Sequence, residues 1–255
     1  MASLQGRHAL VTGGGRGIGR AIAAALTEAG AAVTITGRNE KALADVVGQG
    51  EAAGYVIADV TDAKAVDSGV KQAVAARGPI DLLIANAGTA AAAPFVKTTP
   101  DQFRAMFDVH VLGMLHPLQA VLGGMTERGF GRVVAIASIV GLKASPNVSA
   151  YTTAKHAMVG LVRSVAIETA GTGVTVNAVC PGVTKTLLND ELFAARSQQL
   201  GVSEEKLRSD AINRIPMKTI ATPDQIAPAV VFLASEGAAR ITGEAVNVSA
   251  GAVMH

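Results

Sequence analysis

The stretch HALVTGGGRGIGRAIAAAL, residues 8–26, decides the fold. An apolar run, HALVT, leads into five glycines between positions 13 and 19, and a run of good helix formers follows at once. Where a buried strand turns through glycines into a helix, free backbone N–H groups at the helix N-terminus can hold a phosphate. A glycine motif alone is a weak signal, because ordinary tight turns use the same residues. Its place directly after a strand favours a dinucleotide-binding loop.

Similar apolar runs recur along the chain between segments with helical spacing. Each run is nearly continuous, which is typical of a strand buried on both faces of a parallel sheet. We predict seven strands, at 8–13, 32–37, 55–60, 81–88, 132–138, 174–182 and 244–251. Their alternation with helices predicts an α/β fold, a doubly wound seven-stranded parallel sheet flanked by helices. Residues 1–255 contain no linker and are expected to form one domain, with a candidate substrate lid at 184–217, a polar segment after a strand end.

Composition argues against several classes of protein. The 255 residues are 49% hydrophobic, which is enough for one large core. The formal charge is only +2 and the basic residues are scattered, so a nucleic-acid-binding surface is not expected. The single cysteine, Cys180, excludes an internal disulfide framework and a cysteine-rich metal site. Without a secretory leader pattern or an uninterrupted apolar run of about 18 residues, the sequence predicts a cytoplasmic protein that binds neither membrane nor metal.

Two side chains on the clearest predicted helix, residues 150–171, indicate proton-transfer chemistry. Tyr151 and Lys155 are four residues apart and therefore project from the same face. Tyrosine has a pKa of about 10, but an ammonium about 4 Å away is worth roughly 4 kcal/mol, or about three pKa units before desolvation is subtracted. Ser138 ends the fifth predicted strand, where its hydroxyl can stabilise charge that develops on a substrate oxygen. The three side chains suit hydride transfer between an alcohol and a nicotinamide.

The chain resembles the short-chain dehydrogenase/reductase family from Gly6 to Gly251. The resemblance rests on the Gly-x-x-x-Gly-x-Gly loop, on Asn-Ala-Gly after the fourth strand and on the Tyr-x-x-x-Lys pair. It implies a single-domain Rossmann fold, a homotetramer built from the helices at 101–125 and 150–170 and the last strand, and catalysis by the Ser, Tyr and Lys named above. The positions expected to bind the cofactor on this basis are Gly13, Gly17, Ile18, Gly19, Asp59, Val60, Asn86, Ala87, Gly88, Tyr151, Lys155, Pro181, Gly182, Val183 and Thr186, and Arg16 and Arg38 are expected to bind it because of their charge.

The choice of nicotinamide cofactor depends on charge at the end of the second strand. An NAD site usually has a carboxylate there, which binds the ribose 2′-OH and repels a 2′-phosphate. This chain has Gly37 at that position, followed by Arg38, and Arg16 lies in the glycine loop. Guanidinium groups suit a phosphate, although both could be ordinary surface arginines. We predict NADP(H), with NAD(H) as the alternative.

One position departs from the family pattern. Relatives commonly have an Asn three residues ahead of a Gly on the helix before the fifth strand, where it keeps a water in a proton relay to the lysine. Here His110 precedes Gly113. We expect a working relay that uses either the backbone carbonyl of this position or the imidazole, whose pKa would then lie near physiological pH. His110 is therefore a fourth candidate catalytic residue.

The substrate prediction also rests on two positions at which this sequence differs from its relatives. The chain is most similar to the 3-hydroxybutyrate dehydrogenase and 3-oxoacyl reductase-like branches. The hydroxybutyrate branch holds a carboxylate with a His and a Lys at positions that are Val140 and Val148 here. An unpaired carboxylate is costly in an apolar pocket, and Lys143, which could compensate, is expected to point to solvent. Ile139 and Leu187 complete the candidate substrate residues.

Three functions follow from these residues. The first is interconversion of a neutral, hydrophobic ketone and its secondary alcohol, as a carbonyl reductase or alcohol dehydrogenase. The alternative within the enzyme class is a 3-oxoacyl-CoA or carrier-linked reductase, or a 3-hydroxyacyl dehydrogenase. A dinucleotide-binding sensor without turnover belongs to another class, but such a protein would be expected to lose the Tyr or the Lys.

Overall fold

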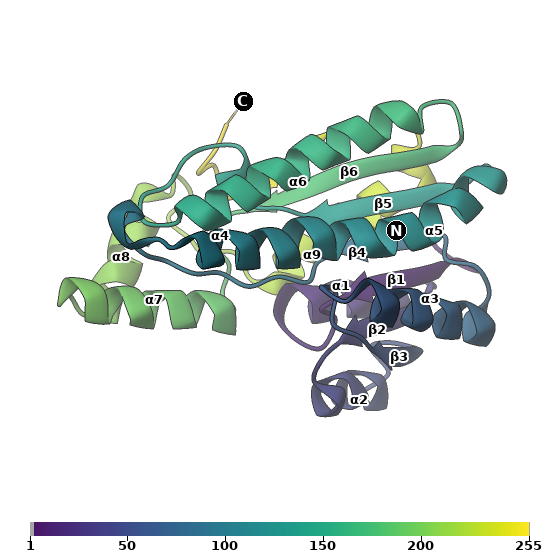
Figure 1. The fold of residues 1–255 in the computed structure, drawn as a ribbon, viewed down its shortest axis with the longest axis horizontal. Helices are drawn as coiled ribbons and strands as arrows, with labels where there is room; N and C mark the ends of the chain where they lie inside the picture. The colour runs from purple at the N-terminus through teal and green to yellow at the C-terminus, as the bar shows by residue number, and fades with distance from the viewer. Residues whose placement is uncertain (1–2, 255) are drawn as a thin grey trace.

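A computed structural model describes residues 3–254 and shows one parallel sheet between two layers of helices (Figure 1). The strand order is β3-β2-β1-β4-β5-β6-β7, and every neighbouring pair is parallel. The strands are β1 His8–Thr12, β2 Ala32–Gly37, β3 Gly54–Ile57, β4 Leu82–Ala85, β5 Gly131–Ile136, β6 Val174–Pro181 and β7 Ala245–Val248. The predicted fold class is confirmed, and most strands end earlier than predicted because their last residues turn into loops.

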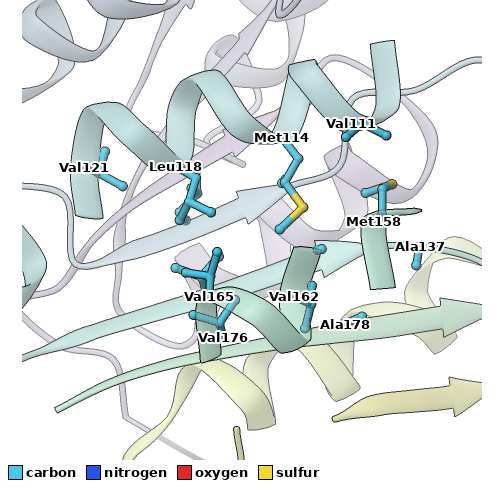
Figure 2. Close-up of a cluster of buried hydrophobic side chains, with 14 of the residues drawn as sticks. Val111, Met114, Leu118, Val121, Ala137, Met158, Val162, Val165, Val176 and Ala178 are labelled. Atoms are coloured by element: carbon cyan, nitrogen blue, oxygen red, sulfur yellow. The ribbon is translucent and has the colours of Figure 1, made fainter. Parts of the chain in front are cut away.

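Two groups of helices cover the sheet. One face packs against α3, α4, α5 and α6, and the other against α1, α2 and α9. Figure 2 shows the first face, where Met114 and Leu118 point from α5 toward Val162 of α6 and the strands below. The helices are α1 Gly17–Glu28, α2 Glu40–Gly48, α3 Ala63–Arg77, α4 Pro100–Phe107, α5 Gly113–Glu127, α6 Ser149–Glu168, α7 Leu187–Leu200, α8 Glu204–Arg214 and α9 Pro223–Ala234. Short helical turns are η1 Phe95–Lys97, η2 Asp108–Leu112, η3 Ile139–Gly141 and η4 Glu236–Ala238.

The strand order reverses between β1 and β4, which are neighbours in the sheet. The chain leaves these two strands in opposite directions, so a crevice opens outside their carboxyl ends. The glycine loop follows β1, and Asn86 follows β4 at the same edge. The fold therefore places both motifs beside the crevice where open α/β sheets bind ligands.

The segment 184–217 forms α7 and α8, which extend beyond the sheet at one end of the molecule (Figure 1). None of the residues of α8 is buried. The lid role assigned to this segment stays a prediction.

The helical stretch Pro100–Glu127 is long and apolar enough, by length and composition alone, to cross a membrane. Its inner face is buried against the sheet and α6 through Met106, Met114 and Leu118. The core helix of a globular domain passes the same test, so this stretch is weak evidence for a membrane span. Within residues 3–254, no group of three or more His, Cys, Asp or Glu side chains is placed to hold a metal ion.

Candidate active site

The glycine loop has the shape of a phosphate cradle. Gly13 and Gly17 have φ values of +66° and +55°, which favour glycine. A Cβ at Gly19 would overlap the Gly13 carbonyl oxygen and Asn86 Nδ2, so the loop packs too tightly for a side chain there. Arg16 caps α1 without a side-chain hydrogen bond to its first turn. The backbone N–H groups at this helix start are therefore available to a phosphate, which fits a dinucleotide.

Asn86 ties the end of β4 to this loop. Its Nδ2 donates to the carbonyl oxygens of Thr12, at 2.9 Å, and Gly13, at 3.2 Å. In return, Thr12 Oγ1 accepts from the backbone N–H groups of Asn86 and Ala87, each at 3.0 Å. A Cβ at Gly88 would lie 2.7 Å from the His110 ring, so the Asn-Ala-Gly turn also packs against His110.

Arg38 and Asp59 lie together beyond the ends of β2 and β3. Arg38 Nη1 is 3.6 Å from Asp59 Oδ2, and the two side chains are 80% and 38% exposed. Hydrogen bonds from Thr61 and the nearby guanidinium lower the pKa of Asp59. Arg16 is also exposed, whereas Val60 is buried and Ile18 is partly buried. The structure thus brings two predicted cofactor residues into contact at an open surface.

The end of β6 reaches the same edge. Pro181 is its last residue, Val183 is partly buried, and a Cβ at Gly182 would lie 3.0 Å from Ser249 Cα. Thr186 caps α7 through a hydrogen bond from Asn189 N–H, and its Cγ2 would lie 3.6 Å from a Cβ at Gly17. Thr186, one of the predicted cofactor residues, therefore faces the glycine loop.

Ser138, Tyr151 and Lys155 meet at the carboxyl end of β5. Ser138 Oγ accepts a hydrogen bond from Val140 N–H at 3.3 Å, which leaves its O–H free to donate. Lys155 is only 3% exposed, and its Nζ donates to the Ile136 carbonyl oxygen at 2.8 Å. The same ammonium lies 5.6 Å from the centre of the Tyr151 ring.

Burial is the main influence on the ionisation of Tyr151 and Lys155. It raises the pKa of Tyr151 to about 12, although the Ser138 hydroxyl acts in the opposite direction. It also lowers the pKa of Lys155 to about 7. The expectation that the ammonium would bring the tyrosine pKa below 10 is not met in this structure, where burial is the largest influence on Tyr151 and the Ser138 hydroxyl is what opposes it.

His110 lies in η2, a π-helical turn that joins α4 to α5. Its Nε2 is 2.7 Å from the Thr89 carbonyl oxygen, so this nitrogen carries the proton, and the buried Nδ1 has no partner among the described residues. The ring meets Tyr151 edge-on, with centroids 5.3 Å apart. Burial, with Lys155 nearby, lowers its pKa well below 6.5. The expectation of a pKa near physiological pH was therefore wrong.

Three of the candidate substrate residues lie close along the chain to Ser138 or Tyr151. Ile139 and Val140 form η3 directly after Ser138, and Val148 precedes α6. A small recess lies beside Val148, lined by Ala91, Ala93, Thr98, Gln102, Asn147, Ser149 and Ala150. Leu187, the first residue of α7, is exposed. No charged side chain lines this recess.

Comparison with known proteins places this geometry in a family. The family model described as Enoyl-(Acyl carrier protein) reductase matches residues 13–253. The D-beta-hydroxybutyrate dehydrogenase of Cupriavidus necator is 36% identical, over 97% of this chain and 98% of the relative. An acetoacetyl-CoA reductase of Shinella zoogloeoides is 39% identical, over 96% of this chain and 98% of the relative. The chain is a short-chain dehydrogenase/reductase.

Solved structures agree. A variant of actinorhodin polyketide ketoreductase crystallised with NADPH has a TM-score of 0.93 and 31% identity to this short-chain dehydrogenase/reductase, covering 99% of both chains. The protein is therefore an NAD(P)-dependent oxidoreductase.

Sequence reasoning missed two supports of this short-chain dehydrogenase/reductase site. Thr12 holds the Asn-Ala-Gly turn through its hydroxyl, and the only available signal was a polar residue at the end of a buried strand. Lys143 was expected to point to solvent; it is exposed, but its Nζ donates to the Ala252 carbonyl oxygen at 2.7 Å. No sequence pattern joins those two positions.

Proposed function

We propose that this enzyme is an NADP(H)-preferring carbonyl reductase and secondary alcohol dehydrogenase for a neutral, hydrophobic ketone. The observation that carries the proposal is that, among the described residues, no charged side chain lines the recess beside Val148. Val140 and Val148 are apolar, and Lys143 donates to a main-chain carbonyl oxygen. A free carboxylate would leave its charge unpaired in such a pocket, whereas a neutral ketone would not.

The proposed roles follow from the geometry. Bound NAD(P)H supplies the hydride that adds to the carbonyl carbon. Tyr151 donates its phenolic proton to the developing alkoxide, and Ser138, whose Oγ accepts from Val140 N–H, donates a second hydrogen bond to the same oxygen. Lys155, held by the Ile136 carbonyl, favours the phenolate that remains. In the oxidation direction the same proton returns to the phenolate.

The preference for NADP(H) rests on Arg38 and on the absence of an acid at Gly37. A guanidinium at the end of β2 favours a 2′-phosphate by charge and by hydrogen bonding. Arg16, exposed at the start of α1, supplies a second cation on the same side of the sheet. NAD(H) stays the alternative cofactor.

A second candidate substrate is a 3-oxoacyl thioester. The 39% identity to an acetoacetyl-CoA reductase favours it. Its reacting ketone is also neutral, so the uncharged lining of the recess does not argue against it. The CoA or carrier part of such a substrate would have to bind outside the pocket. The two substrate classes can therefore be distinguished by comparing kcat/KM for acetoacetyl-CoA with kcat/KM for simple ketones.

The test is NADPH oxidation with three classes of substrate: cyclic and aromatic ketones, acetoacetyl-CoA and acetoacetate. We expect neutral ketones to give the highest kcat/KM, and acetoacetate the lowest. Tyr151→Phe should lower kcat by about 10²–10⁴-fold while NADPH still binds. Tight NADPH binding without turnover on any carbonyl would instead indicate a sensor, and a preference for acetoacetyl-CoA would favour the thioester.

We also propose a homotetramer in the cytoplasm. Exposed apolar side chains on the outer helices support the assembly: Phe107 on α4, Ile167 on α6 and Phe232 on α9 are 44%, 80% and 49% exposed. Light scattering on the purified protein would measure its mass directly.

A further inference from the structure

The ammonium of Lys155 is held by two uncharged acceptors. Lys155 is 3% exposed, and its Nζ donates to the Ile136 carbonyl oxygen at 2.8 Å and to Met158 Sδ at 3.5 Å. A lysine ammonium has three N–H donors, and a buried donor on a charged group is costly to leave without an acceptor. The carbonyl oxygen and the thioether sulfur therefore satisfy two of these donors inside the protein.

The charge of Lys155 has no acidic partner, since none of the ion pairs among residues 3–254 includes this side chain. Tyr151, on the same helix, has its ring centre 5.6 Å from Nζ. His110 of η2 and Cys180 of β6 also lie near enough to interact with the charge. Burial lowers the pKa of Lys155 to about 7, and Cys180 acts in the opposite direction. The ammonium thus depends on neutral dipoles, which gives each of its two hydrogen bonds more weight.

Met158 lies about one helical turn after Lys155 on α6, so the two side chains share a face of the helix. It is 1% exposed and belongs to the buried cluster of Figure 2, at the end that holds Val111 and Ala137. Close packing in such a cluster keeps the sulfur beside the ammonium. A leucine of similar volume would fill the same space. Packing alone therefore does not require a sulfur atom at this position.

Met114 provides a comparison within the same cluster. It lies on α5 and is also 1% exposed. Both methionine sulfur atoms are drawn in Figure 2. Among the described residues the sulfur of Met114 makes no hydrogen bond, whereas that of Met158 accepts one from a buried cation. The contact with Lys155 is therefore particular to Met158 and does not follow from burial.

We propose that Met158 is a positioning residue for the reaction: its thioether accepts a hydrogen bond from Lys155 and, with the Ile136 carbonyl oxygen, holds the protonated amine beside Tyr151. The inference rests on the role that the proposed function gives to Lys155. Leucine cannot perform this task, because its side chain has no acceptor. The alternative is that Met158 only fills space in the buried cluster.

The first test compares Met158→Leu, which removes the acceptor and nearly keeps the volume, with Met114→Leu as the matched control. Reduction of 1-tetralone with NADPH is measured as a function of pH. We expect Met158→Leu to move the inflection of kcat that reflects Lys155 to lower pH by about 0.4–1 unit, the shift for one lost hydrogen bond to the charged form. At about pH 8, kcat should then fall by about two- to ten-fold, whereas KM should stay within about two-fold, because the buried Met158 cannot touch the ketone. Met114→Leu should keep the wild-type profile.

The second test observes the contact by NMR, without turnover. In protein labelled with carbon-13 in its methionine methyl groups, the Met158 signal is the one that is absent from Met158→Leu. This signal should shift with pH around the pKa of Lys155, about 7, and the shift should vanish in Lys155→Met. Burial lowers the pKa of His110 well below 6.5 and raises the pKa values of Cys180 and Tyr151 to about 11 and about 12. A shift near neutral pH therefore reports the ionisation of Lys155.

Several results would overturn the inference. A Met158 signal that stays constant through neutral pH, or that still titrates in Lys155→Met, would refute the contact. An unchanged pH profile in Met158→Leu, or an equal change in Met114→Leu, would mean that Met158 only fills space. A wild type whose Met158 signal titrates as expected, but that reduces no ketone, would refute the proposed function and leave the contact with Lys155 standing.

Discussion

We expect substitutions at two neighbouring positions, Gly37 and Arg38, to reverse the proposed preference for NADP(H). Arg38→Met removes the cation proposed to contact a 2′-phosphate. Gly37→Asp introduces the carboxylate that would bind a ribose 2′-OH. We expect the structure to tolerate this second change, because the atoms nearest to a Cβ at Gly37 would belong to the Leu43 side chain, at 3.5 Å and beyond, which is ordinary van der Waals contact. Gly37→Ala is the matched control, since it adds the same Cβ without charge.

The magnitude follows from the exposure of Arg38. Two unit charges about 4 Å apart are worth about 1 kcal/mol in water and about 4 kcal/mol at an effective dielectric constant of about 20. Because the Arg38 side chain is 80% exposed, the value for water applies. A phosphate with a charge of about −1.5 to −2 then loses about 1.5–2 kcal/mol, a factor of about 10–30. Asp59, which Arg38 partly neutralises, would add repulsion.

The assay is the ratio of kcat/KM for NADPH to that for NADH at saturating ketone. We expect Arg38→Met and Gly37→Asp each to lower this ratio by at least about ten-fold, and Gly37→Ala to leave it near the wild-type value. The effect of Arg38→Met should shrink in about 1 M salt, where the Debye length is about 3 Å. Equal losses for both cofactors would refute the reasoning, because a contact with the 2′-phosphate cannot affect NADH.

Three further predictions concern Gly19 in the glycine loop, the hydrogen bond from Asn86 to the Gly13 carbonyl oxygen, and the buried His110. Gly19→Ala should abolish NADPH binding in a fluorescence titration, whereas Gly123→Ala, whose methyl meets no atom within 4 Å, should not. Asn86→Ala deprives the Gly13 carbonyl of its donor and should lower the free energy of unfolding in urea by about 1–3 kcal/mol; an unchanged value would contradict the tie. His110 has a lowered pKa when folded, so the wild type should lose stability as pH falls below about 6.5. His110→Asn should show a shallower loss in urea titrations, and equal slopes would contradict a buried neutral ring.

The fold was predictable because a parallel sheet buries both faces of its strands. Nearly continuous apolar runs such as ALV at 9–11 and VVAI at 133–136 fit only in strands that are buried in the middle of the sheet. The glycine loop was equally readable, since a positive φ at Gly13 and close packing at Gly19 exclude other residues. The approximate position of each site residue followed from the strand that precedes it.

What the sequence did not show depends on contacts between distant segments. A π-helical turn at 108–112 turns His110 toward Thr89 and Tyr151, and helical periodicity alone gives no signal for such a turn. The contact between Lys143 and Ala252 has the same origin, because two loops meet only once the sheet is assembled. These long-range contacts also set the environment of each ionisable group.

The burial of Tyr151 and Lys155 affects the ionisation of both side chains and therefore the expected pH dependence of the reaction. With Lys155 Nζ 5.6 Å from the ring centre, attraction at an effective dielectric constant of about 20 is worth about 3 kcal/mol. Burial shifts the pKa of Tyr151 upward to about 12, and that of Lys155 downward to about 7, so the charge that would supply the attraction is itself partly lost at neutral pH. A protonated phenol is the acid that ketone reduction requires, whereas alcohol oxidation requires the phenolate. We therefore expect reduction to proceed near pH 7 and oxidation to rise toward alkaline pH, measured as initial rates in both directions. An oxidation rate that is already maximal at pH 7 would show that the phenolate forms despite burial.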